Sequence, residues 1–510
     1  MASLADHIFQ TIARRGPAVA LVVDEVAHSS EQIGARAHAV AAGLATRAVR
    51  PGDRVVVALP NSVDLVVTAL GVLRCGAVLV PVNPAASADE VLYIAGDAGA
   101  RVAIVTAEHN AVLTEAALPE LSLIMYAWEP GDHEAYAPPA IDAEAPALIV
   151  YTSGTTGRPK GAVLSHRALL SNLTTVAEAW RWTERDRLLL TLPCFHLHGL
   201  GLGLLTSFLI GSSVVLQRRF VAEEIFAALE RWQATMFFGV PTMYNRLVAL
   251  PESAAAAHDL SRMRLWVSGS APLMPSTFER FHQRHHVALM DRYGMTECGF
   301  VVATAYEGPR SPGVVGRPLP GISVRIIEPA AADAGEIVDV PDGTGGEIAI
   351  RGPNLFSGYW NRPEETRRVM LEGYLRSGDI AVREPDGQIR IVGRSSVDII
   401  KSRGFKIGAG EIEDCLQRHP SVQEVAVVGL PDADQGERVV AAVTPVADAA
   451  VTVEDLVAFA RQHLAHHKVP SQVVFVAEIP RTGPGKFKKK ELMRLLTAGP
   501  AMVRNQACRS

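Results

Sequence analysis

Short apolar runs rich in β-branched residues alternate with amphipathic segments through the first half of the chain. The runs predict strands at 55–60, 77–84, 102–106, 147–152, 212–217, 235–241 and 264–270. Apolar residues at helical spacing predict helices between them, for example over 62–73 and over 87–98, where Ser87 and Glu90 have capping-box spacing. Alternating strands and helices are typical of parallel sheets covered by helices, so we expect an α/β fold with two parallel-sheet subdomains.

The pattern changes after Gly313, where glycine and proline become frequent and the strand-like runs come closer together. The runs VGRPLPGISVRII, GEIAIRG and QIRIVGR predict antiparallel strands of a β-barrel-like subdomain. The last hundred or so residues combine two helical patterns with the strand-like run EVAVVGLP, which predicts a small α+β unit. We therefore expect a large N-terminal domain of residues 1–393 and a C-terminal domain of residues 394–510.

Composition and charge exclude several classes of protein. Of the 510 residues, 48% are hydrophobic, which is enough for buried cores and excludes a disordered or fibrous chain. The formal net charge of 49 − 54 = −5 lacks the cation excess of a general nucleic-acid binder. The five cysteines are scattered, without a C-x-x-C pair, so we expect neither a disulfide framework nor a structural zinc site. Asp6 interrupts the segment where a signal peptide needs an apolar core, so we expect a cytoplasmic protein.

One uncharged stretch, His198–Leu216, has the nominal length of a membrane span. It contains four glycines and three serines, however, and changes at Gly211 into the strand-like run that ends at Leu216. A buried helix followed by a buried strand is therefore the expected structure.

The string YTSGTTGRPKG, from Tyr151 to Gly161, predicts a phosphate-binding loop directly after a buried strand. Its glycines let backbone N–H groups converge on an anion, its hydroxyls add donors, and Lys160 adds a charge suited to phosphate. A solvated surface loop has no need of so many donors. The string differs from the common P-loop because Pro159 precedes the lysine and a glycine follows it.

This string resembles the phosphate-loop signature of the superfamily of acyl- and aryl-CoA synthetases, adenylation domains and luciferases. Further strings resemble that family's other motifs, in the family's order: YGMTE at 293–297, YLRSGD at 374–379, Gly393-Arg394 followed by KSRGFKIGAGEIE, and PRTGPGK at 480–486. The resemblance covers essentially the whole chain. It implies an AMP-forming enzyme whose small C-terminal domain is mobile about a hinge.

Members of this family activate a carboxylate with ATP and pass the acyl group to a thiol, so the resemblance implies ATP, Mg²⁺ and CoA. The ATP-binding residues that it implies are Thr152, Ser153, Gly154, Thr155, Thr156, Gly157, Lys160, Ser268, Gly269, Tyr293, Gly294, Met295, Thr296, Asp379, Arg394 and Lys486. Within this set, Tyr293 would stack on adenine, Thr296 would bind the α-phosphate, and Asp379 and Arg394 would contact the ribose. Glu297 would ligate Mg²⁺.

The catalytic residues implied by the resemblance are Lys486, Thr296 and Glu297. Lys486 would bridge the carboxylate and the α-phosphate, whereas the basic run from Lys488 to Lys490 is expected to be a solvated face. The loop after the hinge would then move in to line the CoA tunnel with Lys401, Arg403 and Gly404. Arg403 departs from the two glycines of similar enzymes, which leaves the fit of CoA open.

Two arginines bear on the acid that is activated. A buried cation costs several kcal/mol unless it is paired, so Arg246 and Arg292 near one pocket suggest a second carboxylate on the substrate. The strings LPCFHLHGLGLG, GVPTMYNRL, VSGSAPL and DRYGMTE resemble malonyl-CoA synthetases. That resemblance implies that both arginines hold the distal carboxylate of malonate or methylmalonate, with His198 and Ser268 beside it. Arg246 on a helix surface, and Arg292 paired with Asp291, remain alternatives.

Other functions remain open at this stage. The chain is also compatible with a ligase for another short or medium acid, with an enzyme that loads a carrier protein, or with an inactive nucleotide-binding protein. We expect small-molecule substrates, no nucleic acid, no membrane span, and a monomer or homodimer. Cys298, where relatives tend to carry threonine, is expected to be a small buried thiol.

Overall fold

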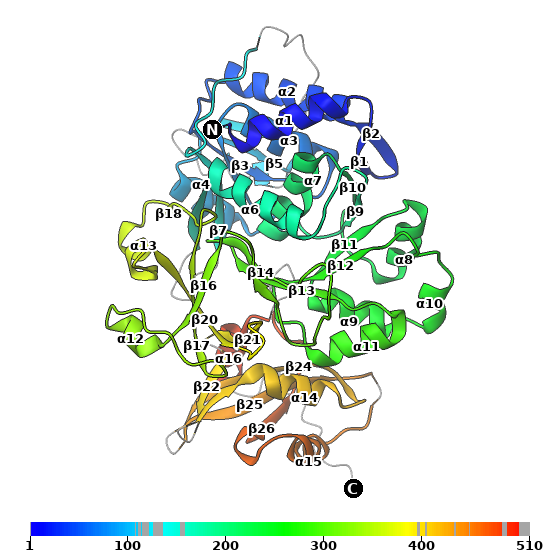
Figure 1. The fold of residues 1–510 in the computed structure, drawn as a ribbon, viewed down its shortest axis with the longest axis vertical. Helices are drawn as coiled ribbons and strands as arrows, with labels where there is room; N and C mark the ends of the chain where they lie inside the picture. The colour runs from blue at the N-terminus through cyan, green and yellow to red at the C-terminus, as the bar shows by residue number, and fades with distance from the viewer. Residues whose placement is uncertain are drawn as a thin grey trace.

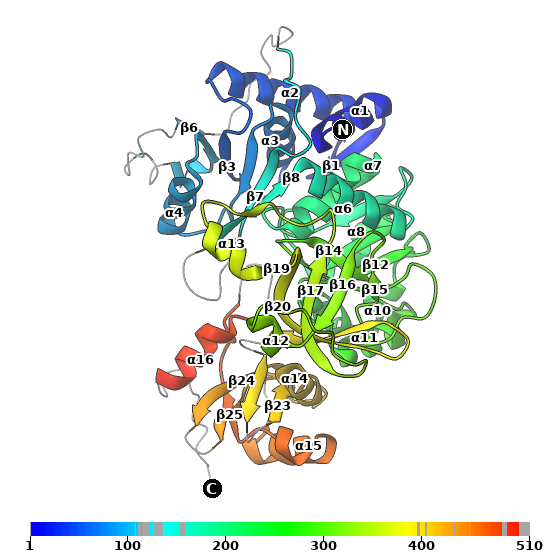
Figure 2. The ribbon, with the colours of Figure 1, turned by 60° about the vertical axis from the view of Figure 1, so that its left-hand side comes forward.

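The computed structural model describes residues 2–107, 109–110, 114, 122–125, 136–152, 159–394, 398–402, 405–432, 435–447, 449–481 and 487–498. Over these residues the strands form four sheets, with helices packed on their faces (Figures 1 and 2). No helix in this part of the chain is long and apolar enough to cross a membrane. The expected α/β class is confirmed.

The first sheet has a parallel centre flanked by antiparallel strands. Its order is β15 (Arg317–Pro318), β14 (Gly299–Ala303), β13 (Met290–Met295), β12 (Leu265–Ser268), β11 (Met236–Gly239), β9 (Arg187–Leu190), β10 (Ser213–Leu216), β1 (Val19–Val23) and β2 (Val26–Ser29). One face is covered by α8 (Ala222–Arg231), α9 (Pro241–Ala249), α10 (Glu252–Ala256) and α11 (Pro275–His285). Large aromatic residues such as Phe237, Trp266 and Phe281 fill this layer.

The second sheet is also parallel at its centre. Its order is β18 (Gly358–Tyr359), β8 (Lys160–Ser165), β7 (Pro146–Thr152), β4 (Val78–Pro81), β3 (Arg54–Ala58), β5 (Val102–Val105) and β6 (Ser122–Met125). Helices α1 (Leu4–Arg15), α2 (Ser30–Thr46), α3 (Val63–Arg74) and α6 (His166–Ala179) contribute to the core shared with the first sheet, and α4 (Ala88–Ala98) packs on the second sheet's other face.

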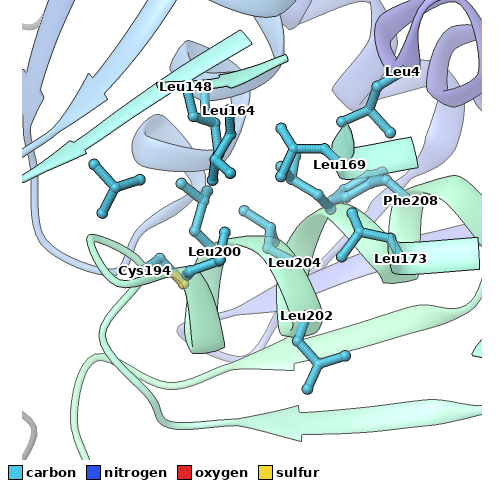
Figure 3. Close-up of a cluster of buried hydrophobic side chains, with 14 of the residues drawn as sticks. Leu4, Leu148, Leu164, Leu169, Leu173, Cys194, Leu200, Leu202, Leu204 and Phe208 are labelled. Atoms are coloured by element: carbon cyan, nitrogen blue, oxygen red, sulfur yellow. The ribbon is translucent and has the colours of Figure 1, made fainter. Parts of the chain in front are cut away.

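The uncharged stretch after His198 lies in this shared core. It forms a π-helix over His198–Leu205, then α7 (Thr206–Ile210), and then β10, so the expected helix followed by a strand is confirmed. Leu200, Leu204 and Phe208 point among leucines from β7, β8 and α6 (Figure 3).

The third sheet is the predicted antiparallel unit. It contains β16 (Ser323–Ile327), β17 (Gly345–Arg351), β20 (Tyr374–Arg383), β19 (Met370–Leu371) and β21 (Ile389–Arg394), with α12 (Pro329–Asp333) and α13 (Pro363–Val369) beside it. The fourth sheet belongs to the small C-terminal unit, with β23 (Phe405–Gly408), β22 (Ile399–Ser402), β25 (Gly436–Pro445), β24 (Val422–Asp432) and β26 (Gln472–Phe475). Helices α14 (Ala409–Gln417), α15 (Val453–His463) and α16 (Lys489–Ala498) and a short 3₁₀ turn at His466–Lys468 complete that unit.

Among the described residues, the small C-terminal unit has hydrophobic clusters of its own. The clusters built from residues between 400 and 492 contain no residue from the sheets that precede them. The boundary predicted at 393/394 falls at the end of β21, where Asp379 and Arg394 are register partners.

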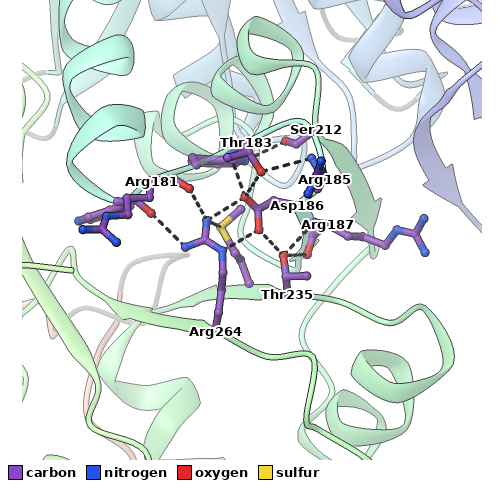
Figure 4. A network of polar contacts seen from close by, with 11 residues as sticks. Arg181, Thr183, Arg185, Asp186, Arg187, Ser212, Thr235 and Arg264 are labelled. Carbon is purple, nitrogen blue, oxygen red and sulfur yellow. Dashed lines mark hydrogen bonds and ion pairs between the residues drawn. The ribbon is translucent and has the colours of Figure 1, made fainter. Parts of the chain in front are cut away.

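An ion pair lies at the amino-terminal ends of β9 and β12, next to the end of α6. Arg264 donates to both carboxylate oxygens of Asp186 at 2.7 and 2.8 Å, and Thr183 and Thr235 donate to the same carboxylate (Figure 4). Burial opposes the charge of Asp186, but these bonds hold its pKa below the usual value.

Candidate active site

The two strands that carry the predicted phosphate loop form one antiparallel pair. Tyr151 of β7 faces Gly161 of β8, and Thr152 faces Lys160. A Cβ atom on Gly161 would lie 2.5 Å from Ile149, so this close approach requires glycine. The expected binding residues between the strands, Ser153, Gly154, Thr155, Thr156 and Gly157, lie outside the described residues.

Lys160 is held by the segment that follows β18. It forms an ion pair with Glu365 of α13, and its ammonium lies 5.5 Å from the centre of the Tyr359 ring. Arg362 in the same segment pairs with Asp97, which also accepts from the Tyr151 hydroxyl. The sequence alone did not indicate Asp97, Tyr359, Arg362 or Glu365 as supporting residues.

Tyr359 also connects Lys160 to the predicted metal ligand. Its hydroxyl donates to Glu297 Oε1 at 2.7 Å, and Glu297 is otherwise buried. No group of three or more acidic, histidine or cysteine side chains within the described ranges is placed to hold a metal. A single carboxylate fits Mg²⁺, which commonly takes one or two protein carboxylates together with phosphate oxygens and water.

A second connection joins the predicted adenine and ribose residues. The Tyr293 hydroxyl donates to Asp379 Oδ2 at 2.7 Å, and burial, followed by the Asp379 charge, raises the Tyr293 pKa. Gly294 follows in β13, where a Cβ atom would lie 2.1 Å from the Gly299 carbonyl oxygen. Met295 ends this strand, and the half-buried Thr296 follows it.

Arg292 lies in a buried polar group on the opposite side of Tyr293. Its guanidinium contacts the Ser270 hydroxyl at 3.4 Å and stacks on the Phe300 ring, 4.5 Å from its centre. His198 Nδ1 lies 3.1 Å from the same Ser270 hydroxyl. Arg292 Nε and His198 Nε2 are buried and have no hydrogen-bond partner among the described residues.

The ionisation of this group follows from its burial. Arg292 is 4% exposed, and burial lowers its pKa to about 9 despite the opposing effect of Asp291. Burial, and then the Arg292 charge, lower the pKa of His198 well below its usual value. At neutral pH the Arg292 guanidinium is therefore cationic, and the His198 imidazole beside it is neutral.

The alternative that Asp291 neutralises Arg292 does not match the geometry. The Asp291 carboxylate accepts from the backbone N–H of Arg292 at 2.8 Å, and no ion pair joins the two side chains or links Arg292 to another described acid. Burial raises the Asp291 pKa to about 8, although the Arg292 N–H and charge oppose the shift. Gly269 packs directly on the guanidinium, since a Cβ atom there would lie 2.4 Å from Arg292 Nε.

Arg246 lies elsewhere, on an exposed position of α9. It lines a cavity of about 960 Å³ between the N-terminal sheets and the small C-terminal unit. The described lining includes Asp291 but neither Arg292 nor His198. The structure therefore does not bring the two arginines together: Arg292 lies in β13, whereas Arg246 lies on α9. Ser268 ends β12 at this edge, and its hydroxyl is buried without a described partner.

The stem of the predicted lysine loop faces the same cavity. Arg481 and Phe487 pair as an antiparallel bridge and both line the cavity, whereas Lys486 lies outside the described residues. Arg403, Gly404 and the side chains of Lys401 and Arg394 are likewise outside what the structure describes.

The expectation of a solvated basic face is wrong for Lys489. This residue is 9% exposed, and its ammonium lies 2.6 Å from both Asp398 and Glu413. A sequence signal existed, because Lys489 shares a helical face with the apolar residues three, four and seven positions later, Leu492, Met493 and Leu496.

Comparisons with known proteins identify the family. The model of the family described as "AMP-binding enzyme" matches residues 8–360, and that of the "AMP-binding enzyme C-terminal domain" matches residues 411–486. The chain is 39% identical to the mitochondrial malonate–CoA ligase ACSF3 of Mus musculus over 69% of its own length and 64% of the mouse protein. It is 36% identical to a feruloyl-CoA synthase of Amycolatopsis sp, over 91% of this chain and 93% of that protein.

Among solved structures, ATP-bound MatB from Rhodopseudomonas palustris superimposes with a TM-score of 0.88 at 32% identity. The superposition covers 96% of this chain and 98% of MatB.

Proposed function

Because the chain belongs to the AMP-binding enzyme family, we propose that the acid activated by this AMP-forming acid–thiol ligase is malonate. One observation carries the proposal: Arg292 is a buried cation that forms no ion pair with an acid among the described residues. Burying an unpaired charge costs several kcal/mol, so such a group is favoured where a ligand supplies the opposite charge.

The reaction has two steps. In the first, a carboxylate oxygen of the acid attacks the α-phosphorus of ATP, and the bond to the leaving pyrophosphate breaks. In the second, the sulfur of CoA attacks the acyl carbon, the thiol proton is lost, and AMP leaves as the bond to its phosphate oxygen breaks. Both steps bring anions together, so positioned cations and donors supply much of the catalysis.

The described residues support the first step in distinct ways. Lys160, at the end of the predicted loop, would bind phosphate, and Glu297 would hold Mg²⁺, which neutralises phosphate charge. Asp379 would accept hydrogen bonds from the ribose, with Tyr293 beside the adenine. Lys486 would bridge the two reacting anions, in keeping with a loop stem that faces the interdomain cavity.

The second step would need a rotation of the C-terminal domain, so that the loop with Lys401, Arg403 and Gly404 replaces the lysine loop. The separate hydrophobic clusters of the two described parts are compatible with such a motion.

The distal carboxylate of malonate fits the chemistry of the Arg292 group. The guanidinium supplies charge, and Ser270 and the neutral His198 supply hydrogen-bonding groups at the same wall. Arg246 would approach from the cavity side, and its role in holding the acid stays a prediction. Methylmalonate differs by one methyl group, which a pocket discriminates by only about 1–3 kcal/mol.

A second candidate is an aromatic or other apolar acid. The Phe300 ring already stabilises the Arg292 charge, and His198 stacks on Phe238 at 6.3 Å. A wall of this kind also suits a flat ring, and the feruloyl-CoA synthase similarity points in that direction. Transfer to a carrier protein instead of CoA, a monomer or homodimer, and a cytoplasmic location also remain predictions.

The test compares AMP formation with malonate, propionate and ferulate, with CoA and ATP saturating. Propionate replaces the distal carboxylate by a methyl group, so it isolates the contribution of that charge. We expect kcat/KM for malonate to exceed that for propionate by roughly 30-fold or more, since truncating one partner of a charged, hydrogen-bonded pair costs about 2–5 kcal/mol.

Arg292→Ala should remove this preference, and Arg292→Lys should restore part of it. Equal use of propionate by the wild type would refute the malonate assignment. Preferential use of ferulate would favour the second candidate.

A further inference from the structure

A hydrogen-bonded contact joins the two domains at the N-terminus of α11. Asp414 of α14 accepts from the backbone N–H of Ser276 at 3.0 Å and from its hydroxyl at 2.7 Å, through the same carboxylate oxygen. Both residues are buried, and α14 lies against α11 in both views of the fold (Figures 1 and 2). Arg418, one turn further along α14, holds the other carboxylate oxygen at 2.7 Å.

Helix α11 lacks a cap of its own. Its N-cap residue is Met274, which makes no side-chain cap bond, and Pro275 at the first helical position has no N–H. Ser276 therefore carries the first free backbone donor of the helix. Asp414 satisfies that donor from the other domain.

Two helices among the described residues have a related arrangement within a single domain, a capping box in which an acid in the first turn accepts from the N-cap residue. Asp455 accepts from the N–H and hydroxyl of Thr452 at 3.0 and 2.7 Å, and Asp6 accepts from both donors of Ser3 at 2.8 Å. Those two carboxylates belong to the helix that they cap. At α11 the equivalent carboxylate comes from a different domain, so the bonds exist only while the two domains keep this arrangement.

The described hydrophobic clusters do not bridge the two domains, so the bonds between Asp414 and Ser276 are a main part of the described interface. The hydrophobic clusters of the C-terminal unit do not extend into the N-terminal sheets. Met274, Pro275 and Asp414 line the interdomain cavity, which also receives the stem of the lysine loop at Arg481 and Phe487.

We propose that Asp414 is a positioning residue that holds the domain arrangement of the first half-reaction by capping α11 across the domain boundary. This inference rests on the proposed function for the role of Lys486. The contact favours the arrangement in which the lysine loop faces the cavity. It must break before the loop at 401–404 replaces the lysine loop, so it affects the two half-reactions in opposite directions.

The test uses Ser276→Ala and Asp414→Ala, with Asp455→Ala as the matched control. The control removes an equivalent pair of bonds at a helix N-terminus within one domain. Small-angle scattering without substrates reports the domain arrangement. Acid-dependent exchange of pyrophosphate into ATP reports the first half-reaction, and thioester formation from supplied acyl-adenylate reports the second.

We expect the two interface variants to populate more extended domain arrangements than the wild type. The ratio of first to second half-reaction rates should fall about tenfold in Asp414→Ala and less in Ser276→Ala, which keeps the N–H bond. Asp455→Ala should leave both the scattering and this ratio unchanged.

Two results would overturn the proposal: unchanged scattering in Asp414→Ala, or a parallel fall of both half-reactions. If the wild type shows no acid-dependent exchange, the proposed function fails. The scattering comparison then still decides whether Asp414 holds the domains together.

Discussion

Replacing Lys489 by methionine tests the buried ion cluster that it forms with Asp398 and Glu413. The substitution keeps the length of an apolar stem but removes the ammonium that lies 2.6 Å from each carboxylate. The buried Glu413 and the partly buried Asp398 then lose this cation. Removing one partner of a buried ion pair costs about 3–5 kcal/mol, so we expect a loss of that size in the free energy of unfolding of the C-terminal unit.

The loss should depend on pH. Burial, with Asp398 as a further cause, already raises the pKa of Glu413, and the Lys489 charge opposes that shift. Without the cation, the pKa in the folded state rises further above its unfolded value. The folded state then binds more protons than the unfolded state between these two values, so stability falls as pH rises through that window. The variant should be least stable at alkaline pH and recover part of the loss toward pH 5.

Urea unfolding followed by circular dichroism at several pH values measures both effects. Lys488→Met is the matched control, because Lys488 is half-exposed and lies 3.4 Å from Glu491 one turn away. Its loss should stay below about 0.5 kcal/mol at every pH. A cost under about 1 kcal/mol for Lys489→Met, or a cost that does not change with pH, would refute the reasoning.

Three further predictions concern the rest of the site and its scaffold. Glu365→Gln releases Lys160 from its ion pair, so the dissociation constant of ATP should fall about 2- to 5-fold by calorimetry, and an unchanged value would show that the pair does not compete with phosphate. Tyr359→Phe removes the bond to Glu297, so the Mg²⁺ concentration for half-maximal AMP formation should change several-fold; the same value as wild type would contradict a metal role for this carboxylate. Gly316→Ala should cost more than about 2 kcal/mol by thermal unfolding, since φ is +97° and the added Cβ would lie 2.0 Å from a carbonyl oxygen; near-wild-type stability would refute this.

The local spacing of apolar residues was sufficient to predict helices and strands. It could not predict contacts between segments that are distant in the sequence. The stretch after His198 shows the success: its glycines and the change at Gly211 indicated a buried helix and a strand. Lys489 shows the failure, because the run of lysines was interpreted by charge while its helical spacing placed one of them on the apolar face. Its partners Asp398 and Glu413 are 91 and 76 residues away, and nothing local indicates that they lie beside it.

The candidate site was predictable where a motif carries its own chemistry. Glu297, Tyr293 and Asp379 lie in motifs, and the structure joins the last two directly. The residues that contact Lys160 were missed, since Tyr359 and Glu365 come near it only when β18, which contains Tyr359, pairs with β8. Arg246 was placed beside Arg292 because both occur in strings that resemble pocket-lining segments, but a motif does not fix which way a side chain on a helix points.

Gly269 has a consequence for which substitutions the buried group around Arg292 can accept. A Cβ atom at this position would lie 2.4 Å from Arg292 Nε, so a side chain there requires the guanidinium to move from its place beside Ser270. Conversely, a smaller residue at position 292 leaves a void that a side chain at 269 is placed to fill. Substitutions at the two positions are therefore coupled, and loss of the buried charge removes the obstacle to a side chain at position 269.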